Sequence, residues 1–255
     1  MKLFNLLLVL LLLSGCASSG GGSSGTPQQD KTRAQASARI HTELAASYYE
    51  RTQYSIALQE IGLALKADEN FPPAYTVRAL VRMALREDEM ADADFRRSLQ
   101  LDSGNSETRN NYGWFLCQRG RAKESIAQFK QALDNPLYAT PEKAYVNLGL
   151  CSKKAGQVKE AENYLERALV LRPGAPEALY GLADVNYDSG DYASAKSYFL
   201  RFLQASSAEL NAEQLWLAVR IERKMRDRNS EASYAIQLRK RFPDSRETQL
   251  LMQGE

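Results

Sequence analysis

The strongest constraint on this chain is an internal repeat of about 34 residues that occurs six times. A small residue recurs once in each unit, at Ala45, Ala79, Gly113, Gly149, Ala183 and Ala218. A second small residue follows each of them after twelve positions, at Ala57, Ala91, Ser125, Ala161, Ala195 and Ser230. Successive members of both series are 34, 34, 36, 34 and 35 residues apart. Two small residues at this separation allow two helices to cross closely, so each unit is predicted to be a helical hairpin.

Other features recur in the same register. Positions within a unit are numbered from the start of its first helix. On this numbering the units begin near Ala38, Pro72, Ser106, Glu142, Pro176 and Asn211. Position 24 carries a bulky residue that is expected to fill the space between the helices: Ile61, Phe95, Phe129, Leu165, Phe199 and Tyr234. Position 7 is apolar or aromatic except in the second unit, where Arg78 is expected to weaken the packing. No segment alternates with period two over any length, so no sheet is expected.

The period and the paired helices are typical of the tetratricopeptide repeat. We therefore predict an all-α fold, a right-handed superhelical solenoid of six helix-turn-helix repeats that spans residues 37–255. Such a solenoid presents an extended concave surface, and its usual role is to hold other proteins.

The first fifteen residues have the features of a secretion signal. Lys2 precedes the apolar run Leu3–Leu13, which is too short to span a bilayer. The run ends in Leu13-Ser14-Gly15-Cys16, which resembles a bacterial lipobox. Cleavage would make Cys16 the first mature residue and the attachment site for diacylglycerol and for further acyl chains such as palmitate. The alternative is an ordinary signal peptide that happens to end near a cysteine.

The segment that follows the lipobox is predicted to be a lipidated flexible tether over residues 16–36, because it is rich in glycine and serine and lacks an apolar pattern. Ala17 stands where an aspartate would favour retention at the inner membrane. We therefore expect an outer-membrane protein, lipid-anchored and facing the periplasm.

In tetratricopeptide arrays the first helix of each unit lines the concave groove. The positions expected to point into it provide the candidate partner-binding residues Tyr49, Leu80, Met83, Asn110, Trp114, Cys117, Leu150, Lys153 and Tyr187. Contiguous exposed apolar surface marks binding sites, and tryptophan and tyrosine often dominate binding energy. The alternative is that solenoid curvature buries some of them against the next helix. The mixed surface suits an amphipathic helix or an extended segment better than a bare C-terminal carboxylate.

Composition points away from several other functions. Acidic and basic residues are interspersed and the net charge is only +2, whereas nucleic-acid binding requires a basic stripe. His41 is the sole histidine, and no phosphate-cradling loop follows a strand. We therefore expect no enzymatic activity, no metal, no cofactor and no small-molecule substrate.

Two cysteines lie within the repeats, at position 12 of the third unit and position 10 of the fourth. These positions point in different directions on their helices. Cys117 and Cys151 are therefore expected to be two small free thiols rather than a disulfide.

Three stretches resemble the type IV pilus biogenesis lipoproteins of the PilF/PilW family. The segment 110–116 (NNYGWFL) is similar to that family's NNYGxFL, and 147–150 (NLGL) to its NLGL. The segment 232–238 (ASYAIQL), followed by Phe242-Pro243, resembles its closing motif. The resemblance implies a non-enzymatic pilotin or later stabiliser that helps the secretin reach the outer membrane or form stable multimers. Its partners would be the secretin or other pilus assembly proteins.

Two other functions fit a lipid-anchored repeat protein. One is a periplasmic adaptor for peptidoglycan or envelope-assembly proteins. The other is an accessory factor for outer-membrane protein assembly.

Overall fold

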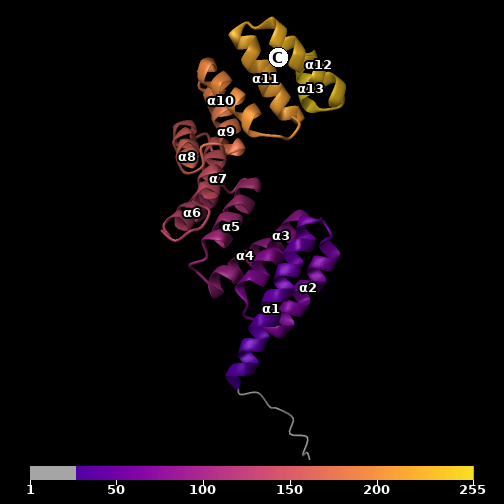
Figure 1. The fold of residues 1–255 in the computed structure, drawn as a ribbon, viewed down its shortest axis with the longest axis vertical. Helices are drawn as coiled ribbons and strands as arrows, with labels where there is room; N and C mark the ends of the chain where they lie inside the picture. The colour runs from indigo at the N-terminus through magenta and orange to yellow at the C-terminus, as the bar shows by residue number, and fades with distance from the viewer. Residues whose placement is uncertain (1–26, 255) are drawn as a thin grey trace, which may run out of the picture.

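A computed structural model describes residues 27–254 (Figure 1), so the predicted signal peptide, Cys16 and the first part of the predicted tether lie outside the described residues. Within that range the chain forms thirteen α-helices and no strand. The helices are α1 (Pro27–Glu50), α2 (Tyr54–Ala67), α3 (Pro72–Ala84), α4 (Asp88–Leu101), α5 (Ser106–Gln118), α6 (Ala122–Leu133), α7 (Pro141–Lys154), α8 (Val158–Leu171), α9 (Pro176–Asp188), α10 (Tyr192–Ala205), α11 (Ala212–Met225), α12 (Arg228–Arg241) and α13 (Arg246–Met252).

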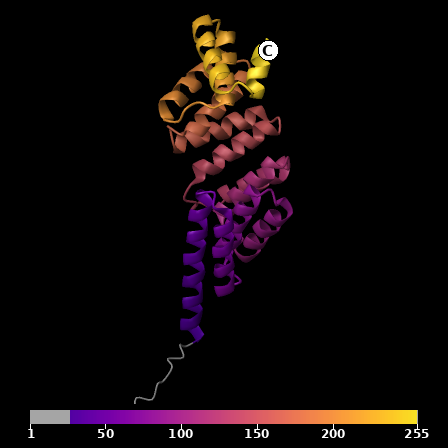
Figure 2. The same cartoon turned by 90° about the vertical axis from the view of Figure 1, so that its right-hand side faces the viewer.

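The first twelve helices form six antiparallel hairpins that stack along the long axis of the molecule (Figures 1 and 2). We call the odd-numbered members α1 to α11 the A helices and their partners the B helices. Neighbouring A helices contact one another from α1 to α9, whereas the B helices make no comparable contact with each other within residues 27–254. The A helices therefore form the inner row of a tetratricopeptide solenoid, and the predicted all-α repeat fold is confirmed.

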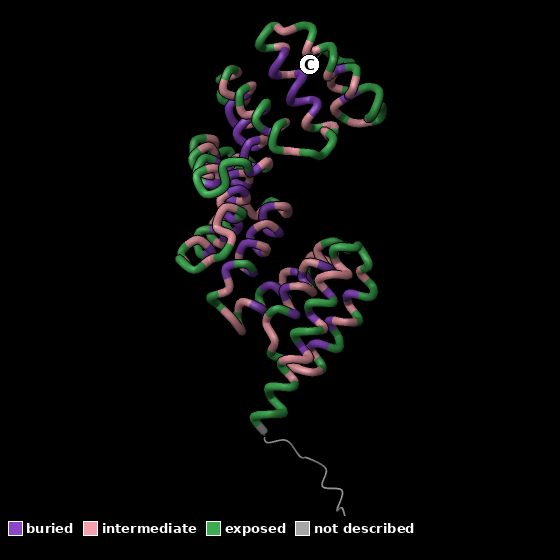
Figure 3. Tube along the Cα trace, viewed as in Figure 1, coloured by how far each residue is buried: buried purple, intermediate pink, exposed green. Residues whose placement is uncertain are grey.

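Close crossing within each hairpin explains the periodic small residues. A Cβ atom added at Gly113 would lie 2.8 Å from the ring of Phe129. At Gly149 it would lie 2.6 Å from Leu165 Cγ and 3.1 Å from the backbone oxygen of Ala161. The bulky residue of the B helix thus occupies the space that a side chain on the A helix would need. Figure 3 shows the resulting buried stretches along the hairpins.

We expect Gly149→Ala to lower the free energy of unfolding by about 1–3 kcal/mol, because the added methyl overpacks a crossing in which one neighbour is backbone. Gly62→Ala is the matched control: it lies in α2 with no atom within 4 Å of the added Cβ, so it should stabilise the protein by about 0.5 kcal/mol. Urea unfolding of both variants measures the difference. Equal effects at the two glycines would contradict the role assigned to the crossing.

The two ends of the solenoid differ from the prediction. Helix α1 begins at Pro27, so residues 27–36, assigned above to the tether, are helical. This segment contains several good helix formers, and extending an existing helix is far less costly than nucleating a new one. At the other end, α13 covers the last hairpin, where Leu250 and Leu251 pack against a cluster that contains Leu215 and Leu238.

The second unit keeps its packing despite the charged residue at position 7. Arg78 donates two hydrogen bonds to Asp94 at 2.8 and 2.7 Å, and Arg82 donates a third at 2.7 Å. The Asp94 side chain is only 5% exposed. A hydrogen-bonded ion cluster therefore stands where the other units place an apolar contact.

The expectation of two free thiols is wrong, because Cys117 and Cys151 form a disulfide that joins α5 to α7. The Cα atoms are 5.9 Å apart, within the range that a disulfide requires. Positions 10 and 12 differ by about 200° around a helix. Position 12 of α5 therefore faces the following A helix, α7, and position 10 of α7 faces the preceding A helix, α5. The difference in direction that argued against the disulfide is what brings the two sulfur atoms together.

The disulfide closes a loop with a sequence separation of 34 residues, so reduction should lower the free energy of unfolding by about 3–4 kcal/mol in the chain-entropy account. Urea unfolding of the oxidised and reduced protein gives the difference. Two alkylated thiols in the untreated protein, detected by mass spectrometry, would show that the bond does not form.

Candidate partner-binding groove

The inner row of helices contains a hollow of about 460 Å³ near the C-terminal ends of α1, α3 and α5. We call it the inner hollow. Three of the predicted groove residues, Tyr49, Met83 and Trp114, line it together. They come from three different repeats, so the stacking of A helices is what assembles the site.

The walls of the inner hollow are supported from beneath by the core. Met83 packs against the aromatic cluster around Phe95 and Phe115, and Trp114 packs against the cluster that holds the disulfide.

Tyr49 lies beside a second tyrosine of the hollow, and the ring centroids of Tyr49 and Tyr54 are 6.1 Å apart. Burial, and then the neighbouring Tyr54, raises the pKa of Tyr49, so its hydroxyl remains neutral and can donate a hydrogen bond near neutral pH.

Polar side chains form the rim of this hollow. Arg119 makes a two-pronged ion pair with Asp88, with both N–O distances 2.6 Å. Gln118 accepts a hydrogen bond of 3.2 Å from Lys154, whose Nζ lies 5.8 Å from the centre of the Trp114 ring. An aromatic and thioether floor inside a polar rim suits a partner segment that buries one apolar face.

The remaining predicted groove residues lie elsewhere. Leu80 and Leu150 are half-buried. Leu80 packs against the core cluster of the second and third units, and Leu150 packs against that of the fourth and fifth units. Asn110 is buried and accepts a hydrogen bond of 3.0 Å from Asn147 of the next A helix. Cys117 is buried in the disulfide. Asn110 and Cys117 thus join neighbouring repeats and do not face the groove.

Lys153 and Tyr187 belong to a second polar and aromatic region farther along the inner row. Lys153 forms an ion pair with Asp184 and another, of 2.9 Å, with Asp188. The guanidinium of Arg220 lies 4.5 Å from the centre of the Tyr187 ring and 5.9 Å from that of Trp216. Sequence reasoning missed Trp216 and Arg220, although their four-residue spacing places them on one face of a helix.

Residues that could carry other chemistry are dispersed. His41 Nδ1 lies 2.7 Å from Glu60 Oε2, in a hydrogen bond between α1 and α2. Across residues 27–254, no three His, Cys, Asp or Glu side chains are grouped so that they could hold a metal ion. None of the helices in this part of the chain is long and apolar enough to cross a membrane.

Comparison with known proteins points to one family. The tetratricopeptide repeat family matches residues 153–209. The type IV pilus assembly protein PilF of Pseudomonas aeruginosa is 31% identical over 220 residues, which cover 86% of each chain. An uncharacterized protein of Haemophilus influenzae is 26% identical over 133 residues, which cover 52% of this chain and 74% of that protein.

Solved structures agree with the sequence match. The crystal structure of PilW, described as a widely conserved type IV pilus biogenesis factor, superposes with a TM-score of 0.77 and 36% identity. That match covers 84% of this chain and 98% of PilW. The structure of P. aeruginosa PilF superposes with a TM-score of 0.79 and 29% identity, over 88% of this chain and 99% of that protein. Sequence, repeat type and fold together place this chain in the PilF/PilW family of type IV pilus biogenesis proteins.

Proposed function

We propose that this protein is a non-enzymatic outer-membrane lipoprotein that holds a segment of the pilus secretin in its inner hollow and thereby promotes the localisation, assembly or stability of the secretin multimer. The observation that carries the proposal is the inner hollow in a chain of this family. Tyr49, Met83 and Trp114, from three repeats, bring two aromatic rings and a thioether to one open hollow, and tyrosine and tryptophan often dominate the binding energy of protein interfaces.

The role proposed for the lipid anchor at Cys16 is to confine the solenoid to the membrane where the secretin assembles. Several acyl chains together anchor a protein far more stably than one chain. Confinement of two partners to one surface raises their effective concentration and favours association without any new contact. The protein would then act by position and binding, not by chemistry.

Complementation of a deletion strain tests the proposal. We expect Trp114→Ala and Met83→Glu to reduce heat-stable secretin multimers and surface pili by about tenfold, since loss of a central binding residue commonly costs more than 1 kcal/mol. Lys159→Ala, an exposed change on α8 away from the hollow, is the matched control and should complement fully. Immunoblots of unheated envelopes and electron microscopy of pili provide the two readouts.

The anchor is tested in the same strain with Cys16→Ala. We expect the unlipidated protein to leave the outer-membrane fraction and secretin multimers to fall, with normal protein levels. Wild-type multimers and pili in the deletion strain would refute a secretin role, and an altered peptidoglycan profile in that strain would favour the envelope adaptor instead.

A further inference from the structure

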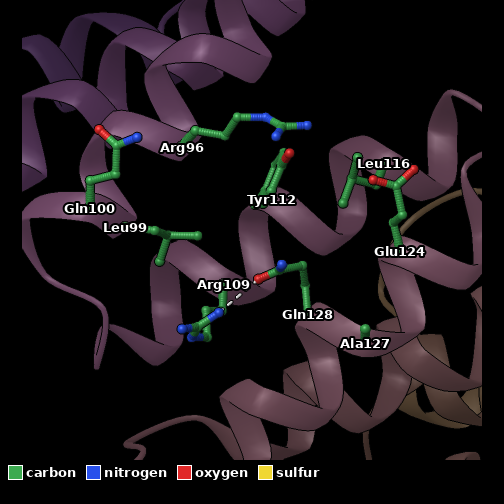
Figure 4. Close-up of a pocket in the computed structure, with 9 residues that line it drawn as sticks. All are labelled: Arg96, Leu99, Gln100, Arg109, Tyr112, Leu116, Glu124, Ala127 and Gln128. Carbon is green, nitrogen blue, oxygen red and sulfur yellow. Dashed lines mark hydrogen bonds between the residues drawn. The ribbon is translucent and has the colours of Figure 1, made fainter.

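A second hollow, of about 420 Å³, lies among the B helices α4 and α6 and the helix α5 between them (Figure 4). We call it the outer hollow. Its apolar lining is supplied by Leu99 of α4, Tyr112 and Leu116 of α5, and Ala127 of α6. None of these residues lines the inner hollow, so the second and third units carry two separate openings.

The third unit differs from the fourth at two positions beside the outer hollow. In the fourth unit, positions 4 and 23 hold Tyr145 and Tyr164, whose rings stack with centroids 6.5 Å apart. In the third unit the same positions hold Arg109 and Gln128, joined by a hydrogen bond of 3.0 Å (Figure 4). The third unit thus has a polar pair where the fourth has two aromatic rings.

The charge of Arg109 is not balanced by a carboxylate within the described part of the chain. Its guanidinium donates to the backbone oxygen of Ser103 at 3.1 and 2.8 Å, and to the side-chain oxygens of Gln128 and Gln131. All of these acceptors are neutral.

The other charged residues at the rim are paired. Arg96 binds Asp92 at 2.5 Å, and Glu124 binds Arg121 at 2.7 Å. Arg109 is therefore the charged rim residue that has no carboxylate partner within residues 27–254. A carboxylate would bind its guanidinium more strongly than the glutamine amides do.

We propose that the outer hollow is a second docking site, which takes an aromatic side chain from an extended acidic segment of a partner protein and binds a carboxylate of that segment through Arg109. The aromatic ring would enter the outer hollow and pack on the accessible side chains of Leu99 and Ala127, with the buried Tyr112 and Leu116 beneath them. Because the two hollows share no lining residue, one solenoid can hold two segments at once.

The test uses a defined probe and the whole protein, kept unlipidated by Cys16→Ser. The probe is the capped peptide Gly-Ser-Trp-Asp-Ser-Gly, and its controls replace Trp by Ala or Asp by Asn. NMR titration of the methyl groups should show saturable shifts at Leu99 and Leu116 with the probe. Each control peptide should bind about tenfold more weakly, the factor that corresponds to loss of one charge-assisted hydrogen bond or one aromatic contact.

Protein variants assign the binding to the outer hollow. Arg109→Gln should weaken the probe about tenfold, and Arg109→Lys, which keeps the charge but loses the forked geometry, should have an intermediate effect. Ala127→Trp should fill the hollow and abolish binding. Trp114→Ala should leave the titration unchanged, so this site and the proposed function of the inner hollow can fail separately.

Three results would overturn the proposal: no methyl shift at about 5 mM probe, which corresponds to affinity too weak for a docking site; equal binding by the wild type and Arg109→Gln; or shifts centred on Met83 instead of Leu99. Melting curves of each variant establish that it is folded. Arg109→Gln decides the outcome if Ala127→Trp does not fold.

Discussion

The close crossing of the A and B helices is the contact on which the rest of this structure depends. Each hairpin has a glycine or alanine on its A helix at the crossing, where the bulky residue of the B helix packs, as Leu165 packs on Gly149. Neither helix could be stable alone, because a helix of 13 or 14 residues, such as α5 or α7, is marginal in water without tertiary packing. Once the crossing is made, each hairpin presents an apolar edge to the next, and stacking follows.

The openings on the surface are consequences of that stacking. The inner hollow is assembled from the ends of three A helices, and no single repeat contains it. The outer hollow lies beside Arg109 and Gln128, at two positions whose residues differ from unit to unit. In a solenoid, function can therefore change at one repeat while the neighbouring repeats keep the fold, since each unit contacts only those beside it.

Much of this architecture could be predicted from the sequence, because a repeat displays the same packing requirement six times. The register of small and bulky residues predicted the hairpins, and the solvent-facing positions of the A helices predicted Tyr49, Met83 and Trp114. The disulfide was missed because a helical wheel describes one helix and not the relation between two. Asn110 was assigned to the groove for the same reason, although it is buried and accepts a hydrogen bond from Asn147 of the next unit. The outer hollow is a space that the surrounding side chains leave unfilled. Such a space can be recognised only from the three-dimensional structure.

The disulfide also has a mechanical consequence for a protein proposed to be held at one end and to bind partners along its length. When a chain is pulled from both ends, each unfolded residue adds about 3.4 Å of extension. The segment between Cys117 and Cys151 cannot contribute while the bond is intact, because the force passes through the sulfur atoms. The disulfide therefore shortens the greatest length to which the unfolded chain can be stretched by about 110 Å.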